Sequence, residues 1–290
     1  MPPYANYDKL CAEIKSYADN YLTRFPRQYG FNIYYRGHAK CVWDYVPSIA
    51  RTVDSESDIV KTAISDGEWD ISRSLFENIA RLQHYGKPTR FLDYTTDLDV
   101  ALYFACSEHK DEDAEIQIVA YDLRDNRNID TIAITELALR NETIPVYDFA
   151  ESILNKYPTK ALDDVYDKDE GNTDWNIREI GARVLSWIDH GFMVTYSDAD
   201  KKSLEEWNPR LLHQKGAFFV FGNLTNPPHV GAATYNVKST SILPKIANTP
   251  HLIKEAKTIV IPKELKQEVI SALEEKGITE SYIYPNETQL

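Results

Sequence analysis

Residues 82–96 read LQHYGKPTRFLDYTT and follow a segment whose apolar residues recur with helical spacing. From Ile71 to Leu82 these residues share one face, which predicts a helix over about residues 69–83. Gly86 is a typical helix stop, and Pro88 prevents the helix from continuing. The sequence therefore predicts a helix that ends inside this stretch.

The second half of the stretch predicts an extended segment and then another helix. Residues 89–94 are expected to be tightly extended. The sequence Thr96-Asp97-Leu98-Asp99 resembles a capping box, so we expect a helix from there to about Glu108. A loop held between two rigid helices is where binding groups usually lie.

Periodicity along the rest of the chain predicts an α+β fold. Helical spacing predicts helices over residues 8–25, 132–141, 147–156, 176–189 and 263–276. Short apolar or β-branched runs predict strands over residues 31–35, 116–123, 217–221, 258–261 and 281–284. We therefore expect a single domain over residues 1–290, with a mixed β-sheet core, surrounding helices and a helical insertion at about 130–210.

Composition argues against several classes of protein. The chain has 290 residues, of which 43% are hydrophobic and 27% charged, a balance typical of globular proteins. Its net charge of −13 argues against a broad nucleic-acid surface but leaves room for a local basic pocket. The three isolated cysteines predict no disulfide framework, and no metal-ligand spacing is visible. Without a signal-like start or a long apolar run, we expect a cytoplasmic protein with no membrane contact.

The first candidate group is Tyr35-Arg36-Gly37, at the end of the strand predicted over residues 31–35. An arginine at a strand end can hold a phosphate or carboxylate through two hydrogen bonds. Gly37 would let such a ligand approach the backbone closely. An ion pair between Arg36 and one of the many acidic residues is the alternative.

The second candidate group lies within residues 82–96. As a binding loop, it offers the side chains of His84, Arg90 and Asp93 to a ligand. As a structural crossover, it would have His84 bonded to a backbone carbonyl and Arg90 paired with Asp93. Thr96 would then cap the following helix. The residues alone leave both interpretations open.

The order of these motifs resembles the FRG domain family, which takes its name from a Phe/Tyr-Arg-Gly motif. The matching pieces are Tyr35-Arg36-Gly37, Pro47-Ser48, and residues 83–96, 101–105, 214–218 and 277–285. The resemblance extends over about residues 31–285.

A more distant resemblance, to the Arg-Ser-Glu branch of the ADP-ribosyltransferase superfamily, implies a chemistry. That branch begins with an aromatic-Arg-Gly on a strand, continues from a strand into a helix, and ends with a late catalytic glutamate. Arg36 fits the first element, residues 95–104 fit the second, and Glu280 fits the third. The resemblance implies a split β-sheet core and NAD as substrate, with no metal.

The same resemblance implies a role for individual residues. Arg36 would bind phosphate, while His84 and Thr95 would line the ribose or nicotinamide site. Glu280 would be the catalytic carboxylate, stabilising an oxocarbenium-like species, and His84 would also serve as acid or base. The nucleotide-binding residues expected are Tyr35, Arg36, Gly37, Tyr85, Thr89, Arg90, Asp93, Thr95, Thr96 and Gln214.

The function we expect is NAD-dependent ADP-ribosyl transfer to an unknown macromolecular acceptor. Two alternatives stay open: an NAD glycohydrolase, and a non-catalytic module that senses a nucleotide or a partner protein. Both enzymes require Glu280 and Arg36 to face one pocket. The sensor requires a pocket with Arg36 but no carboxylate near the ribose.

Overall fold

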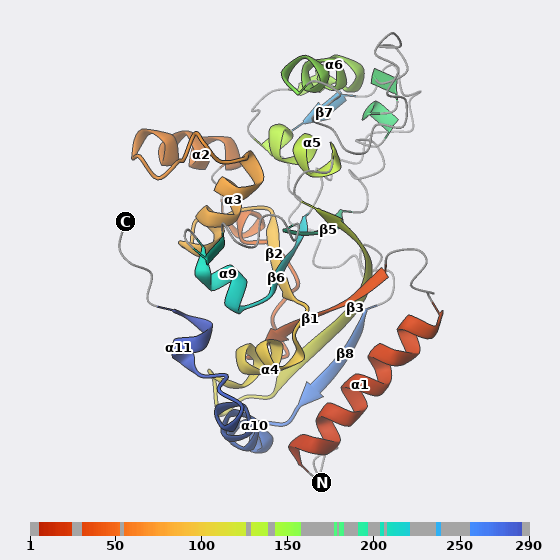
Figure 1. Cartoon of the computed structure of the whole chain (residues 1–290), viewed down its shortest axis with the longest axis vertical. Coiled ribbons are helices and arrows are strands. Elements are labelled where there is room, and N and C mark those ends of the chain that lie inside the picture. The colour runs from red at the N-terminus through yellow and green to blue at the C-terminus, as the bar shows by residue number, and fades with distance from the viewer. Residues whose placement is uncertain are drawn as a thin grey trace.

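The structure is a computed structural model that describes residues 6–24, 31–52, 55–125, 129–138, 143–157, 177–178, 180–182, 191–196, 204–205, 208–220, 236–238 and 256–285. They form an α+β fold in which helices surround a central sheet (Figure 1). The strands of this sheet are β1 (Phe31–His38), β2 (Phe91–Thr95), β3 (Ala114–Asp125), β5 (Phe192–Thr195), β6 (Gly216–Val220) and β8 (Lys257–Ile261). Two short strands, β4 (Thr143–Pro145) and β7 (Asn236–Lys238), pair with each other outside it.

The strand pairings of the main sheet close into a ring. β1 pairs with β2 and with β3, β2 pairs with β6, β6 with β5, and β5 with β3. β8 extends the sheet beside β3. All these pairings are antiparallel except that of β3 with β5. β1 and β2 share one residue pair, Tyr35 with Thr95, so the ring is closed there by the shortest of its pairings.

The inside of this ring is a packed core. One cluster receives side chains from all five strands: Tyr34, Leu92, Tyr94, Val119, Met193, Ala217 and Phe219. Since side chains alternate between the two faces of a strand, a cluster shared by every strand of a ring occupies its interior. Each of these residues is at most 3% exposed.

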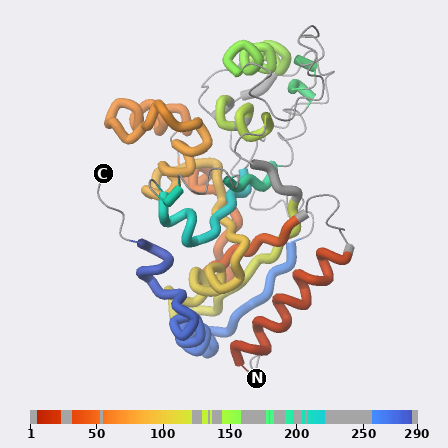
Figure 2. Tube along the Cα trace, viewed as in Figure 1, coloured from red at the N-terminus to blue at the C-terminus, as the bar shows by residue number. Residues whose placement is uncertain are grey.

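One outer face of the sheet is covered by α1 (Tyr7–Arg24), α4 (Leu98–Cys106) and α10 (Lys263–Glu275). Their apolar residues pack with Ile116 of β3 and Ile259 of β8 in a second core cluster. In Figure 2, α1 and α10 lie at the end of the molecule that carries the N-terminus. The predicted helices over residues 8–25 and 263–276 are confirmed to within a residue or two.

The other outer face is covered by α3 (Leu75–His84), α5 (Ile129–Ala138) and α6 (Val146–Lys156). Phe76 of α3 packs on Phe91 of β2, with ring centroids 5.3 Å apart, at the centre of a third cluster. In Figure 1, α5 and α6 lie at the end of the molecule opposite α10. α3 and α4 therefore both pack beside β2.

The helix predicted over residues 69–83 begins later than expected. Ser74 is the N-cap of α3 and forms a capping box with Glu77. Ile71, which periodicity placed on the helix face, is 95% exposed in the preceding turn. The helix begins after Ser74 because this cap residue has an extended backbone. Ile71 therefore lies outside the helix. A separate helix, α2 (Glu56–Ser65), precedes this turn and was not predicted.

The last element is a helix, although residues 281–284 were predicted as a strand. Thr279 is the N-cap of α11 (Glu280–Ile283), and its hydroxyl accepts a hydrogen bond from the amide of Tyr282. A threonine cap favours a helical turn here over the β-propensity of the aromatic and β-branched residues that follow. Glu280 is therefore the first residue of a helix.

The region predicted as a helical insertion, residues 130–210, is helical at α5 and α6. Residues 177–178 and 180–182 are also helical, and the rest of the helix predicted over residues 176–189 lies outside the described residues. β5 falls within the same region but is a strand of the main sheet, because Phe192–Val194 are buried between β3 and β6. Among the described residues, no helix combines the length and apolarity needed to cross a bilayer.

Candidate functional site

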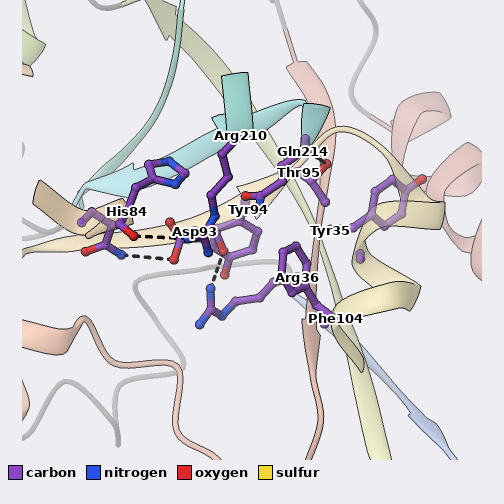
Figure 3. A pocket seen from close by; sticks show the side chains of 12 residues that line it. Tyr35, Arg36, His84, Asp93, Tyr94, Thr95, Phe104, Arg210 and Gln214 are labelled. Carbon is purple, nitrogen blue, oxygen red and sulfur yellow. Dashed lines mark hydrogen bonds between the residues drawn. The ribbon is translucent and has the colours of Figure 1, made fainter. Parts of the chain in front are cut away.

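A pocket of about 170 Å³ lies where β1 and β2 part beyond the Tyr35–Thr95 pair (Figure 3). β1, β2, the end of α3 and one side of α4 form most of its walls. The remaining wall comes from α9 (Pro209–His213) and the residue after it. The lining residues are Tyr35, Arg36, Gly37, Gln83, His84, Asp93, Tyr94, Thr95, Ala101, Phe104, Arg210 and Gln214.

Arg36 crosses the gap between the parted strands. Its Nη1 donates a 2.5 Å hydrogen bond to the backbone carbonyl oxygen of Asp93, and its Nε donates to Nε2 of His38 at 2.9 Å. The first bond satisfies a β2 carbonyl next to the point where pairing with β1 stops. Nη2 of Arg36 has no hydrogen-bond partner among the described residues.

Gly37 is required by the packing of α4 on β1. A Cβ atom at this position would lie 2.0 Å from the carbonyl oxygen of Ala101 and 2.7 Å from the amide nitrogen of Ala105, both in the backbone of α4. We expected the glycine to give a ligand access to the backbone. Gly37 does line the pocket, but the space of its missing side chain is taken by α4.

His84 and Arg210 form the wall at the end of α3. Nη1 of Arg210 donates to the carbonyl oxygen of His84 at 3.2 Å, and its guanidinium lies 4.7 Å from the centre of the Tyr284 ring. Burial lowers the pKa of His84 to about 4; the charge of Asp93 opposes this shift, and that of Arg210 adds to it. His84 is therefore neutral at neutral pH, which disfavours the predicted acid role. Its Nε2 and the Nε of Arg210 are buried without a hydrogen-bond partner in the described structure.

Among the described residues that line the pocket, Asp93 is the one with a carboxylate. It is exposed, and its Oδ2 accepts a hydrogen bond from Nε2 of Gln83 at 3.1 Å. The Oε1 of the same glutamine accepts the hydroxyl proton of Thr89, which is buried behind the wall. Thr89 therefore supports the site through Gln83 without lining it.

Residues 31–114 match the model of the FRG domain. The protein contains an FRG domain. The matched segment includes β1, α2, α3, β2 and α4, and it supplies every lining residue from Tyr35 to Phe104. No curated protein and no solved structure matches the chain.

Arg210 and Gln214 lie outside the matched FRG segment and complete its pocket. The side-chain Nε2 of Gln214 donates to the carbonyl oxygen of Ile283 at 3.2 Å, which ties the pocket wall to α11. The backbone oxygen of Gln214 accepts the hydroxyl proton of Thr95 at 2.7 Å, and that hydroxyl also accepts from the amide of Asp97. Thr95 thus joins β2, the loop after α9 and the start of α4.

Thr96 does not line the pocket, and its predicted role as the cap of the next helix is taken by Asp97. The carboxylate of Asp97 accepts from the amide of Asp99 and pairs with Lys215 at 2.6 Å. Tyr85 is also outside the lining: it is the C-cap of α3, is 52% exposed, and has Arg81 over its ring.

Arg90 was predicted to bind nucleotide, but it is completely buried in the FRG domain. Its Nε and Nη2 each bond to the Oε2 of Glu56 at 2.7 Å, and its backbone amide donates to Oε1 of the same residue. Glu56 opens α2 and is 4% exposed. The pair holds α2 against the start of β2, so Arg90 has a structural role and the predicted Arg90–Asp93 pair does not form.

Glu280 is exposed at the start of α11 and is not among the lining residues. It is close enough to the pocket rim to influence Tyr284, whose pKa is raised mainly by burial, with the charges of Glu108 and Glu280 adding to the shift. Phe104 of the pocket wall meets Tyr284 edge to face at 6.3 Å. Glu280 therefore lies near Tyr284, which contacts the pocket residue Phe104, and is itself outside the lining.

Sequence reasoning missed Arg210, Phe104 and Ala101, and did not assign Gln83 a role. The helical spacing of Ala101 and Phe104 on α4 carried a signal, because residues on the face that packs on β1 also reach the gap beside it. No signal in the sequence points to Arg210, whose position depends on α9 folding against α3. Within the described residues, no group of three or more His, Cys, Asp or Glu could hold a metal ion.

Proposed function

We propose that this pocket binds the nicotinamide–ribose end of NAD and that the protein transfers ADP-ribose from NAD to an acceptor. The observation that carries the proposal is the meeting of two arginines and one carboxylate, Arg36, Arg210 and Asp93, in a single pocket. Arginine bonds to phosphate contribute roughly 1.5–3 kcal/mol each, so two arginines favour a ligand with more than one anionic group. A dinucleotide has such a pyrophosphate.

The size of the pocket supports insertion of one end of this ligand. Drug-sized molecules occupy pockets of roughly 300–1,000 Å³, whereas this one measures about 170 Å³. A nicotinamide ring with part of its ribose is of suitable size, and the phosphates would stay at the mouth. Tyr35 and Phe104 give the pocket aromatic surface for a planar ring.

In this proposal Asp93 takes the role that the sequence assigned to Glu280. The bond between ribose C1′ and the nicotinamide nitrogen breaks, and its electron pair leaves with neutral nicotinamide. The positive charge that develops at C1′ is stabilised by the Asp93 carboxylate, as in glycosidases. An oxygen or nitrogen of the acceptor, or water, then bonds to C1′ and releases its proton to solvent.

The experiment is incubation of the purified chain with NAD labelled in its adenylate half. Nicotinamide release is measured by chromatography, and retained label is measured on added protein and nucleic acid. We expect release that falls at least tenfold in Arg36→Gln and is unchanged in Lys61→Gln, which removes a cation on α2 whose side chain is 67% exposed. If the native chain neither binds nor cleaves NAD, the proposal is rejected.

A second candidate, a non-catalytic nucleotide sensor, is favoured by the bonds already made inside the pocket. Gln83 holds the Asp93 carboxylate, and Arg36 uses Nη1 and Nε on protein atoms. These bonds hold the side chains in place for binding, and binding alone requires no reaction at the site. Saturable NAD binding with no release of nicotinamide would identify this function.

A further inference from the structure

A buried polar cluster of His38, Tyr45 and Glu115 contacts Arg36 through His38, and none of the three lines the pocket. β1 and β3 pair so that Arg36 is opposite Gln117 and His38 is opposite Glu115. His38 is 3% exposed and Glu115 is 6% exposed. Tyr45 stacks on the imidazole of His38, with ring centroids 4.3 Å apart.

The hydrogen bonds of this cluster determine the tautomer of His38. The guanidinium of Arg36 can only donate, so the Nε2 atom of His38, 2.9 Å from Nε of Arg36, must be an acceptor. The ring proton then lies on Nδ1, which faces Oε1 of Glu115 at 3.3 Å. Tyr45 donates its hydroxyl proton to the same oxygen at 2.7 Å. Nε of Arg36, Nδ1 of His38 and the hydroxyl of Tyr45 each therefore have an acceptor.

The surroundings of His38 favour its neutral form. Burial lowers the pKa of His38, and the positive charges of Arg36 and Arg51 lower it further. The hydrogen bond and the charge of Glu115 oppose this shift without reversing it. A protonated His38 would carry a proton on Nε2 and could no longer accept from Arg36. The bond to Arg36 thus depends on an imidazole that stays neutral.

We propose that His38, oriented by Glu115, is a positioning residue for Arg36. Two fixed bonds, from Nε to His38 and from Nη1 to the carbonyl of Asp93, define the plane of the guanidinium. The position of Nη2 is then fixed by that plane, although arginine is a long side chain with many rotamers. This arrangement parallels metal-site histidines, whose second nitrogen is oriented by a carboxylate. The inference deepens the proposed function, since it concerns the arginine assigned to the ligand.

The first test reads the hydrogen bonds without any ligand. The full chain is labelled with ¹⁵N in arginine and histidine, and the His38 tautomer is read from its two nitrogen shifts at pH 7.5 and pH 6.0. We expect the Nδ1–H tautomer at both pH values and a scalar coupling between Nε of Arg36 and Nε2 of His38. An Nε2–H tautomer, or a doubly protonated ring at pH 6.0, overturns the proposal whether or not NAD binds.

The second test measures NAD affinity in two variants of His38. His38→Leu removes the acceptor, whereas His38→Gln keeps an amide oxygen that can accept from Nε of Arg36. We expect the dissociation constant to rise at least tenfold in the leucine variant and less than threefold in the glutamine variant. Lys61→Gln, which removes an exposed cation on α2 outside this cluster, serves as the control.

Melting temperatures of the variants separate positioning from folding. Equal loss of affinity in His38→Leu and His38→Gln, at equal melting temperature, overturns the positioning role. If His38→Leu does not fold, the dissociation constant of His38→Gln decides, and a rise of tenfold or more in that folded variant overturns the proposal. If the native chain does not bind NAD, the proposed function fails by itself, and the tautomer measurement still judges this inference.

Discussion

Nη1 of Arg36 lies 2.5 Å from the backbone carbonyl oxygen of Asp93, across the gap where β1 and β2 separate. This bond joins the arginine of the FRG motif to the strand that carries the carboxylate of the pocket. The two groups most suited to hold an anion and to stabilise a cation are therefore held in one rigid unit. A displacement of either strand would alter both.

Gly37→Ala should destabilise the protein more than Gly67→Ala. A methyl group at Gly37 would meet the backbone of α4 at 2.0 Å, so β1 or α4 must shift. We expect the free energy of unfolding to fall by about 3 kcal/mol. Urea denaturation measures it, with Gly67→Ala as control. Gly67 has a φ of +76° but no atom near its Cβ position, so only backbone strain of about 1 kcal/mol applies there.

The Glu56–Arg90 pair should show strong coupling in a double-mutant cycle. Removing one partner leaves an unpaired charge in the core, so Glu56→Leu or Arg90→Met should each cost about 3–5 kcal/mol. The double variant Glu56→Leu with Arg90→Met should cost much less than the sum, because no charge is left buried. Chemical denaturation of the four proteins measures the coupling. Additive costs would show that the two side chains act independently.

His84 should make the protein sensitive to acid. Its pKa is about 4 in the folded protein and 6.5 in an ordinary environment, so below pH 6.5 the unfolded state takes up a proton that the folded state refuses. The free energy of unfolding therefore falls as the pH drops from 6.5 toward 4, by up to about 2 kcal/mol at pH 5. His84→Gln should lose this part of the pH dependence. Denaturation curves of both proteins at pH 7.5 and pH 5 make the comparison.

Asp93 and Glu280 are the two candidates for the catalytic carboxylate. Substitution of each one shows which of them NAD cleavage requires. Asp93→Asn should lower NAD cleavage at least a hundredfold, because Asp93 is the carboxylate on the pocket wall. Glu280→Gln should change it less than threefold, since Glu280 is exposed at the start of α11, outside the lining. Single-turnover release of nicotinamide measures both variants. The reverse ranking would restore Glu280 as the catalytic group.

Local patterns in the sequence predicted much of the fold because they depend on local chemistry. The predicted helix end at Gly86, the extended segment over residues 89–94 and the helix that follows all lie within a few residues of the end of α3, of β2 and of α4. Local patterns alone left the roles of Arg36, His84 and Asp93 open. The resemblance to the FRG domain family placed them in one site, and all three line the pocket.

The remaining features depend on contacts between distant parts of the chain. Arg90 looked like a ligand residue because its partner Glu56 lies 34 positions earlier, in a helix that was not predicted. Arg210 reaches the pocket only because α9 packs near the end of α3. Ile71 and Glu280 were misplaced for a local reason: the caps at Ser74 and Thr279 override the periodic pattern.

The single residue pair between β1 and β2 gives the pocket a property that can be measured without knowing its ligand. A molecule that contacts Arg36 on β1 and Asp93 or Thr95 on β2 links these two strands. Their own pairing is the shortest in the ring. The binding energy of such a molecule then adds to the work of unfolding, by about 2.7 kcal/mol when its concentration is a hundred times its dissociation constant. Thermal-shift screening of nucleotides and other anions would therefore identify the ligands that bind, because each of them would raise the melting temperature.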